Sequence, residues 1–98
     1  MAFTDTDIER GIVNLLSERN PSSSICPSDV ARALTDEETR WRALMPQVRE
    51  VAKRMASKKF IRVTQGDSEV EIDEQLRGPI RLRRGSNYPD ADRVEKQP

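Results

Sequence analysis

Apolar residues near the start of the chain recur at helical spacing. They follow one another at intervals of four, three and one positions and so share one helical face: Ile8, Ile12, Leu15 and Leu16. Thr6 and Glu9 have the spacing of a capping box, which predicts a helix with Thr6 as its N-cap. Asn20-Pro21 is expected to end this helix, and three serines follow as a loop.

A second helix is predicted to start at Cys26-Pro27-Ser28-Asp29. Proline suits the first helical position, and aspartate suits the first turn. Its buried side is expected to be Val30, Ala31 and Leu34. Ile25, alone among polar residues, is a candidate for a very short strand. Thr35 and Glu38 are again spaced as a capping box and indicate a third helical start.

The third helical stretch is the longest, from about residue 38 to residue 57. Its apolar side chains fall within a stripe of roughly 120°: Trp41, Leu44, Met45, Val48, Val51, Ala52 and Met55. A proline inside a helix costs about 3 kcal/mol. Pro46 therefore predicts a kink or two separate helices, and we favour a break or sharp bend just before it. Trp41, in the middle of the stripe, is expected to anchor the core rather than to bind a ligand.

After residue 60 the period changes from helical to alternating. Ile61 and Val63 alternate with polar residues, as do Val70 and Ile72, which predicts two strands. Between them, Gln65-Gly66-Asp67-Ser68 can form a tight hairpin. A third short strand is predicted over residues 80–83, after Gly78-Pro79. Residues 85–98 are rich in polar residues and are expected to form a flexible C-terminal tail.

The predicted order is helix, short strand, helix, helix, strand, wing loop, strand. This is the order of a winged helix-turn-helix, an α+β fold with three or four helices and a small antiparallel sheet. Residues 5–84 are predicted to form this single domain. Only 35% of the 98 residues are apolar and 35% are charged, which is lean but sufficient for one modest core.

The composition excludes several kinds of chemistry. The chain has no histidine and one cysteine, so an ordinary zinc site lacks ligands and the commonest general base is missing. Its four glycines lie far apart and form no phosphate-binding loop. We expect no enzymatic activity, no cofactor and no metal. A single cysteine, a first segment unlike a signal peptide and the lack of a long apolar run predict a cytoplasmic protein without membrane contact.

Charge is sorted along a chain whose net charge is zero. Residues 40–84 carry 12 Lys/Arg against 6 Asp/Glu, whereas residues 1–39 carry 3 against 8. On the third helix, the face opposite the apolar stripe holds Arg42, Arg49, Lys53 and Arg54. Long cations on an exposed helix suit contact with phosphates beside a groove of duplex DNA. The alternative is a solvated face on which Glu50 and Arg54 form an ordinary pair four residues apart.

The strands supply further candidate contacts to a DNA backbone: Arg62, Arg81, Arg83 and Arg84. The wing tip, however, carries Asp67 and Glu69, which disfavour insertion into the minor groove. The acidic strand residues could instead pair with the arginines across the sheet, each pair contributing roughly 0.2–1 kcal/mol.

Cys26 and three arginines each allow two interpretations. At a helix N-terminus, backbone N–H groups stabilise a thiolate, so Cys26 could sense oxidants and change DNA binding. The alternative is a small, partly buried substitute for an N-cap, near Trp41 or Ile25. Arg32, Arg42 and Arg81 could contact phosphate or could pair with Asp29, Asp36 or Glu37 and fix how the helices dock.

Three blocks of the sequence resemble a known family. They are Cys26-Pro27-Ser28-Asp29-Val30-Ala31-Arg32, the stretch Trp41-Arg42-Ala43-Leu44-Met45-Pro46 with Val48-Arg49, and Gly78-Pro79-Ile80-Arg81-Leu82. Together they resemble an uncharacterised, mostly bacterial domain family of unknown function. The resemblance spans about residues 7–84 and implies a small winged-helix-like fold, with no established activity. Such domains often place a glycine where Lys59 stands.

The sequence therefore predicts a non-catalytic module that binds nucleic acid, with double-stranded DNA as the expected partner. A transcriptional regulator is the role that such a module suggests. A domain of this size usually needs a homodimer or a partner for specific binding. The competing interpretation is a protein-protein interaction module of the same fold. Zero net charge and a pI near 6.3 favour that alternative, because nucleic-acid-binding domains are commonly basic.

Overall fold

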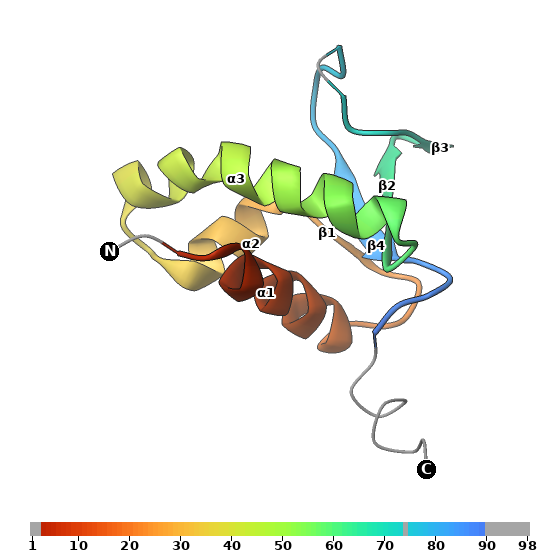
Figure 1. Cartoon of the computed structure of the whole chain (residues 1–98), viewed down its shortest axis with the longest axis horizontal. Helices are drawn as coiled ribbons and strands as arrows, with labels where there is room; N and C mark the ends of the chain where they lie inside the picture. The colour runs from red at the N-terminus through yellow and green to blue at the C-terminus, as the bar shows by residue number, and fades with distance from the viewer. Residues whose placement is uncertain (1–2, 74, 90–98) are drawn as a thin grey trace.

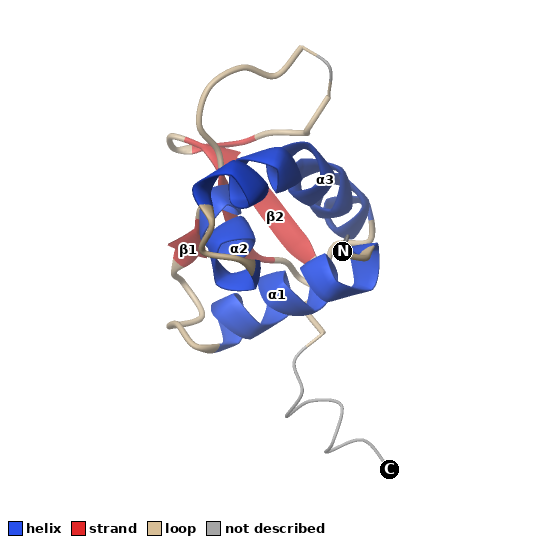
Figure 2. Cartoon of the chain, turned by 90° about the vertical axis from the view of Figure 1, so that its left-hand side faces the viewer, coloured by secondary structure: helices blue, strands red, loops and turns tan. Residues whose placement is uncertain are grey.

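The computed structural model describes residues 3–73 and 75–89 of the chain. Three helices gather on one side of a four-stranded antiparallel sheet with the strand order β1-β4-β2-β3 (Figures 1 and 2). The elements, in chain order, are α1 (Asp5–Ser17), β1 (Ser24–Ile25), α2 (Pro27–Leu34), α3 (Glu38–Ser57), β2 (Ile61–Gln65), β3 (Ser68–Glu69) and β4 (Arg81–Arg84). The predicted α+β class and the short strand at Ile25 are confirmed.

The first helix begins two residues earlier than predicted. Thr4 is its N-cap, and the capping box pairs Thr4 with Asp7: each backbone N–H donates to the other side chain, at 3.0 and 3.1 Å. The predicted box of Thr6 and Glu9 is wrong. Thr4 and Thr6 each precede an acidic residue by three positions, so local sequence fits both starts. Tertiary contacts favour the earlier one, because it packs Phe3 against the core and brings Asp5 to α3.

The third helix begins with Glu37 as its N-cap, so the predicted capping box of Thr35 and Glu38 is also wrong. Thr35 instead ends α2, with an extended backbone and its N–H bonded to the carbonyl of Ala31 at 3.1 Å. Its hydroxyl accepts from the N–H of Glu37 at 3.4 Å. Thr35 serves the end of α2 and lies two positions before Glu37, so it is too early to cap α3.

The same helix runs from Glu38 to Ser57 through Pro46, so the predicted break is wrong. Pro46 is exposed. Proline has no N–H, so the carbonyl four residues earlier loses its helical hydrogen bond, and on this exposed face water can replace it. The apolar stripe continues across the proline on the buried side, with Leu44 before it and Val48 after it. Packing of this stripe against α1 and α2 offsets the local cost of the proline.

The end of α3 is a Schellman motif formed around Lys59. The N–H of Phe60 bonds to the carbonyl of Met55, and the N–H of Lys59 bonds to the carbonyl of Ala56, both at 3.0 Å. This geometry requires a left-handed residue, and Lys59 has φ 66°. The glycine that the resemblance suggests for this position would adopt it without strain.

Replacing Lys59 by glycine is therefore expected to raise the free energy of unfolding by about 0.5–1 kcal/mol. Thermal or urea unfolding measures the change. Lys58→Gly is the matched control, because Lys58 has φ −91° and gains nothing from glycine. It is expected to lower the stability by a similar amount. If both variants are destabilised alike, the left-handed backbone at Lys59 carries no strain.

The predicted hairpin is confirmed, but its second strand is shorter than predicted. Gln65 pairs with Ser68 across a two-residue turn, in which Gly66 has the left-handed φ of 61°. Val70 and Ile72 alternate as predicted but lie outside β3, and the N–H of Val70 bonds to the carbonyl of Val63 at 2.8 Å. The last strand begins at Arg81, one residue later than predicted.

The core lies between the helices and the inner face of the sheet. Its largest fully buried side chains are Ile8, Ile12, Leu16, Ile25, Met55, Ile61, Ile80 and Leu82. Trp41 packs against this core but remains half-buried, with the guanidinium groups of Arg32 and Arg42 each 5.2 Å from its ring centre. Trp41 therefore lies at the edge of the core and not at its centre.

Of the predicted flexible tail 85–98, residues 90–98 lie outside the described residues. The described part packs against the domain. Tyr88 is buried, and its hydroxyl donates to the carbonyl of Val13 at 2.7 Å. The N–H of Gly85 bonds to the carbonyl of Phe60 at 3.0 Å and continues the pairing of β2 with β4. Residues up to 88 therefore contribute to the folded core.

Candidate nucleic-acid interface

Two of the four predicted cations on α3 are held by carboxylates. Arg42 donates to Glu38 through Nε and Nη2, at 2.8 and 2.7 Å, and also stacks on Trp41. Both members of this pair are exposed, so the pair contributes little stability but reduces the local positive potential. Arg42 would therefore have to exchange Glu38 for a phosphate in order to contact DNA.

Arg54 points toward the start of α1, where it forms an ion pair with Asp5. Gln47 also donates to Asp5, at 2.9 Å, and these two hydrogen bonds lower the pKa of Asp5. In return, Asp5 raises the pKa of Arg54, with a smaller contribution from Glu50. Arg54 thus links α3 to α1 and lies on the flank of α3 that faces the N-terminal helix.

Arg49 and Lys53 lie on the other flank of α3, four residues apart and therefore on the same side. Arg49 is half-buried and Lys53 is exposed. Lys53 stands at a groove of about 290 Å³ between the end of α3 and the hairpin. Arg62, from β2, lines the same groove. The structure thus brings two of the predicted contacts, Lys53 and Arg62, to one surface.

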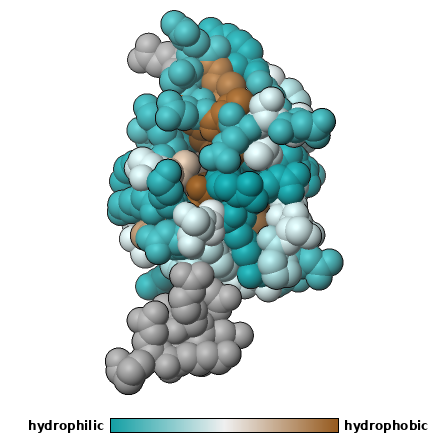
Figure 3. Space-filling model, turned by 90° about the vertical axis from the view of Figure 1, so that its right-hand side faces the viewer, coloured by the Kyte–Doolittle hydropathy of each residue, from teal (hydrophilic) through white to brown (hydrophobic). Residues whose placement is uncertain are grey.

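The groove has both apolar and charged walls. Its apolar side chains are Ala56, Ile61, Val63, Val70 and Ile72. Its acidic side chains, Glu69 and Glu71, stand among the cations. Figure 3 shows this face of the molecule as a brown apolar strip between hydrophilic lobes. The groove therefore attracts anions only weakly. Arg49, four residues before Lys53 on α3, adds a second positive charge beside it.

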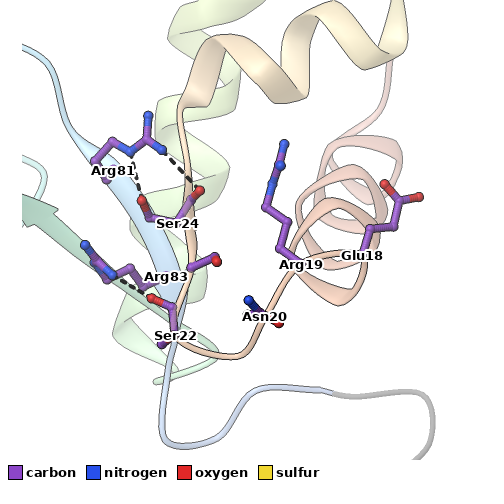
Figure 4. Close-up of a pocket in the computed structure, with 8 residues that line it drawn as sticks. Glu18, Arg19, Asn20, Ser22, Ser24, Arg81 and Arg83 are labelled. Carbon is purple, nitrogen blue, oxygen red and sulfur yellow. Dashed lines mark hydrogen bonds between the residues drawn. The ribbon is translucent and has the colours of Figure 1, made fainter.

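Two of the predicted strand arginines lie at a second site. Arg81 and Arg83, from β4, line a polar hollow of about 640 Å³ together with Arg19 and the serines of the loop before β1 (Figure 4). In that view α3 lies behind the strands. Arg19 was not predicted from the sequence, because only the antiparallel pairing of β1 with β4 brings the end of α1 close to the last strand.

The remaining two predicted arginines serve the fold. Arg84 is half-buried: its Nη2 donates to the carbonyls of Leu16 and Arg19, at 2.8 and 3.1 Å, and its guanidinium lies 4.8 Å from the ring centre of Tyr88. Arg84 therefore satisfies carbonyls at the C-terminal end of α1. Arg62 donates to the carbonyl of Arg84 at 3.2 Å, in addition to its place at the groove.

The arginines of the recognisable blocks have local partners as well. Arg32 lies 3.8 Å from Asp29 and stacks on Trp41. Arg81 donates to Sγ of Cys26 at 2.7 Å. Cys26 is the half-buried N-cap residue of α2, and its own N–H donates to Asp29 at 2.9 Å. Arg32 thus uses Asp29, one of the partners that the sequence allowed, whereas Arg42 pairs with Glu38 and Arg81 bonds to Cys26.

Within residues 3–73 and 75–89, no helix is long and apolar enough to cross a membrane. In the same residues, no three or more cysteine, aspartate or glutamate side chains are grouped as metal ligands would be.

The fold and its surfaces define a small α+β domain with two charged depressions, one mixed and one rich in arginine. The chain belongs to the family of proteins of unknown function DUF3253, whose model matches residues 5–85. The predicted resemblance to a family of unknown function is thereby confirmed. Among curated proteins, none matches the chain.

Proposed function

We propose that this domain is a winged helix that binds double-stranded nucleic acid without catalysis. The order of elements supports this: a helix, a short strand, two helices and a hairpin, with β1 pairing with β4 and β4 with β2. In this arrangement α2 and α3 form the helix-turn-helix unit, and the hairpin of β2 and β3 is the wing. The single cysteine favours action in the cytoplasm.

The observation that carries the proposal is the basic flank of α3 beside the wing. Arg49 and Lys53 follow one side of this helix, and Arg62 lines the same groove as Lys53. Cations on a helix and on the adjacent strand can contact phosphates on both sides of a major groove. Arg42 and Arg54 contribute less, because each is held by a carboxylate. We expect a homodimer or a partner to be needed for specific binding.

Lys53→Ala is expected to weaken binding to generic duplex DNA and to reduce the slope of log affinity against log salt by about 1. The reason is that each phosphate neutralised by a cation releases a counterion. Fluorescence anisotropy across salt concentrations measures the slope. Arg10→Ala, which removes one positive charge from α1, is the control and should leave the slope unchanged.

A second candidate function is docking of a protein segment in the groove. The apolar walls of the groove and its mixture of charges support this alternative. The chain also leaves β2 after Val70, so part of the edge of β2 is not paired with β3 and could pair with an added strand. Undetectable binding to duplex DNA at about 50 mM salt would place this second function first.

A further inference from the structure

We propose that the polar hollow between the end of α1 and β4 binds a phosphoryl oxyanion through Arg19, Arg81 and Arg83. The ligand class is a tetrahedral phosphate group, either a phosphomonoester or a phosphodiester. This goes beyond the proposed function, because the hollow is lined by the α1–β1 loop and β4 and includes none of the α3 residues that carry that function.

Strand pairing places the two arginines of β4 on one surface. Leu82 is buried between them, and side chains alternate along a strand, so Arg81 and Arg83 both project from the opposite face. Ser24 pairs with Arg83 in the register of β1 and β4. Arg19 reaches the hollow from the turn after α1, as Figure 4 shows. Three arginines from two distant parts of the sequence thus line the hollow.

Two of these guanidinium groups are ordered before any ligand arrives. Arg83 donates through Nη1 to the carbonyl of Ser22 at 2.9 Å and through Nε to the hydroxyl of Thr64 at 3.3 Å. Arg81 donates through Nε to the hydroxyl of Ser24 at 2.9 Å and through Nη2 to its carbonyl at 3.1 Å. A guanidinium carries five N–H donors, so both arginines retain donors for an oxyanion. Ordered donors lose little conformational entropy on binding.

The electrostatics of the hollow favour an anion. Three arginines oppose one carboxylate, that of Glu18. The carbonyls at the C-terminal end of α1 would repel a phosphate, since they form the negative end of the helix dipole. Arg84 covers two of them by donating to Leu16 and Arg19. Serine hydroxyls from the loop supply additional neutral donors, and the lining offers almost no apolar surface to a larger ligand.

Titration of the full chain with inorganic phosphate, followed by amide NMR at constant ionic strength, tests the proposal. We expect saturable shifts at residues 22–24 and 81–83, and a roughly tenfold weaker affinity in Arg19→Gln, which loses one charge-assisted contact. Arg10→Gln removes the same charge from the same helix outside the hollow and should bind phosphate like the unaltered chain. Melting curves of both variants establish that they fold.

Shifts that do not saturate, or equal weakening in Arg19→Gln and Arg10→Gln, would overturn the proposal. Two further arms identify the source of the phosphate group. If duplex DNA displaces inorganic phosphate and Arg19→Gln also weakens the duplex, the ligand is a nucleic-acid backbone. If glycerol phosphate displaces it and duplex DNA does not, the ligand is a phosphomonoester. Neither arm involves Lys53, so failure here is distinguishable from failure of DNA binding by α3.

Discussion

Gly85→Ala is expected to lower the free energy of unfolding by at least about 3 kcal/mol, and in a domain of this size that can abolish folding. A Cβ at position 85 would lie 2.9 Å from the backbone nitrogen of Ile61 and would collide with the carbonyl oxygen of Lys59. Both atoms belong to the backbone between the end of α3 and the first residue of β2, which cannot rotate away as a flexible side chain could. Urea unfolding followed by circular dichroism measures the loss.

Gly66→Ala is the matched control for this prediction. A Cβ at position 66 meets nothing within 4 Å, so only the left-handed φ of 61° opposes the substitution. Its expected cost is about 1 kcal/mol. Equal stability of the two variants would mean that the close approach of Gly85 to Lys59 and Ile61 does not exist in solution.

Tyr88→Ala is expected to destabilise the domain by about 3 kcal/mol or more, because it empties a buried aromatic site. The ring covers the guanidinium of Arg84 and joins α1 to the chain after β4. The phenol donates its single hydrogen to the carbonyl of Val13, and the hydroxyl of Ser17 lies 2.6 Å from it as the donor of a second bond. Thermal unfolding measures the effect.

Tyr88→Phe separates the two contributions of this side chain. It keeps the ring and loses both hydrogen bonds, so we expect a cost of about 1–2 kcal/mol. If the alanine variant is no less stable than the phenylalanine variant, the ring does not pack into the core. A chain that folds normally without residues 85–98 would contradict the prediction in the same way.

Local sequence was sufficient for the elements whose signals have one solution. The second helix follows directly from Pro27 and Asp29, and the bounds of α3 follow from its apolar stripe. The hairpin turn follows from Gly66. In each case the residues that specify the element lie within it.

The errors arose where distant contacts decide between local alternatives. Two threonines could cap α1, and the link from Asp5 to Gln47 favours the earlier one. Pro46 predicts a break, but the packing of residues on both sides of it keeps the helix continuous. Val70 and Ile72 have the pattern of a strand, yet the chain leaves β2 there. The spacing of apolar residues and the secondary-structure propensities of single residues contain no information about contacts with residues far away in the sequence.

The candidate sites were predictable as a list of cations but not as surfaces. Sequence spacing places Arg49 and Lys53 on one flank of α3. It cannot tell that Arg54 pairs with Asp5, which lies 49 residues away, or that Arg84 turns inward to the end of α1. Arg19 joined the candidates only when the pairing of β1 with β4 was known.

The bond between Tyr88 and Val13 spans 75 residues and has a consequence for synthesis on the ribosome. Within this domain, α1 is synthesised well before Tyr88, which supplies one of its buried contacts. Until Tyr88 has been added to the growing chain, the inner face of α1 lacks this contact, and β1 lacks its partner β4 until residues 81–84 appear. This domain therefore completes its fold only after residues 81–88 have been added to the growing chain.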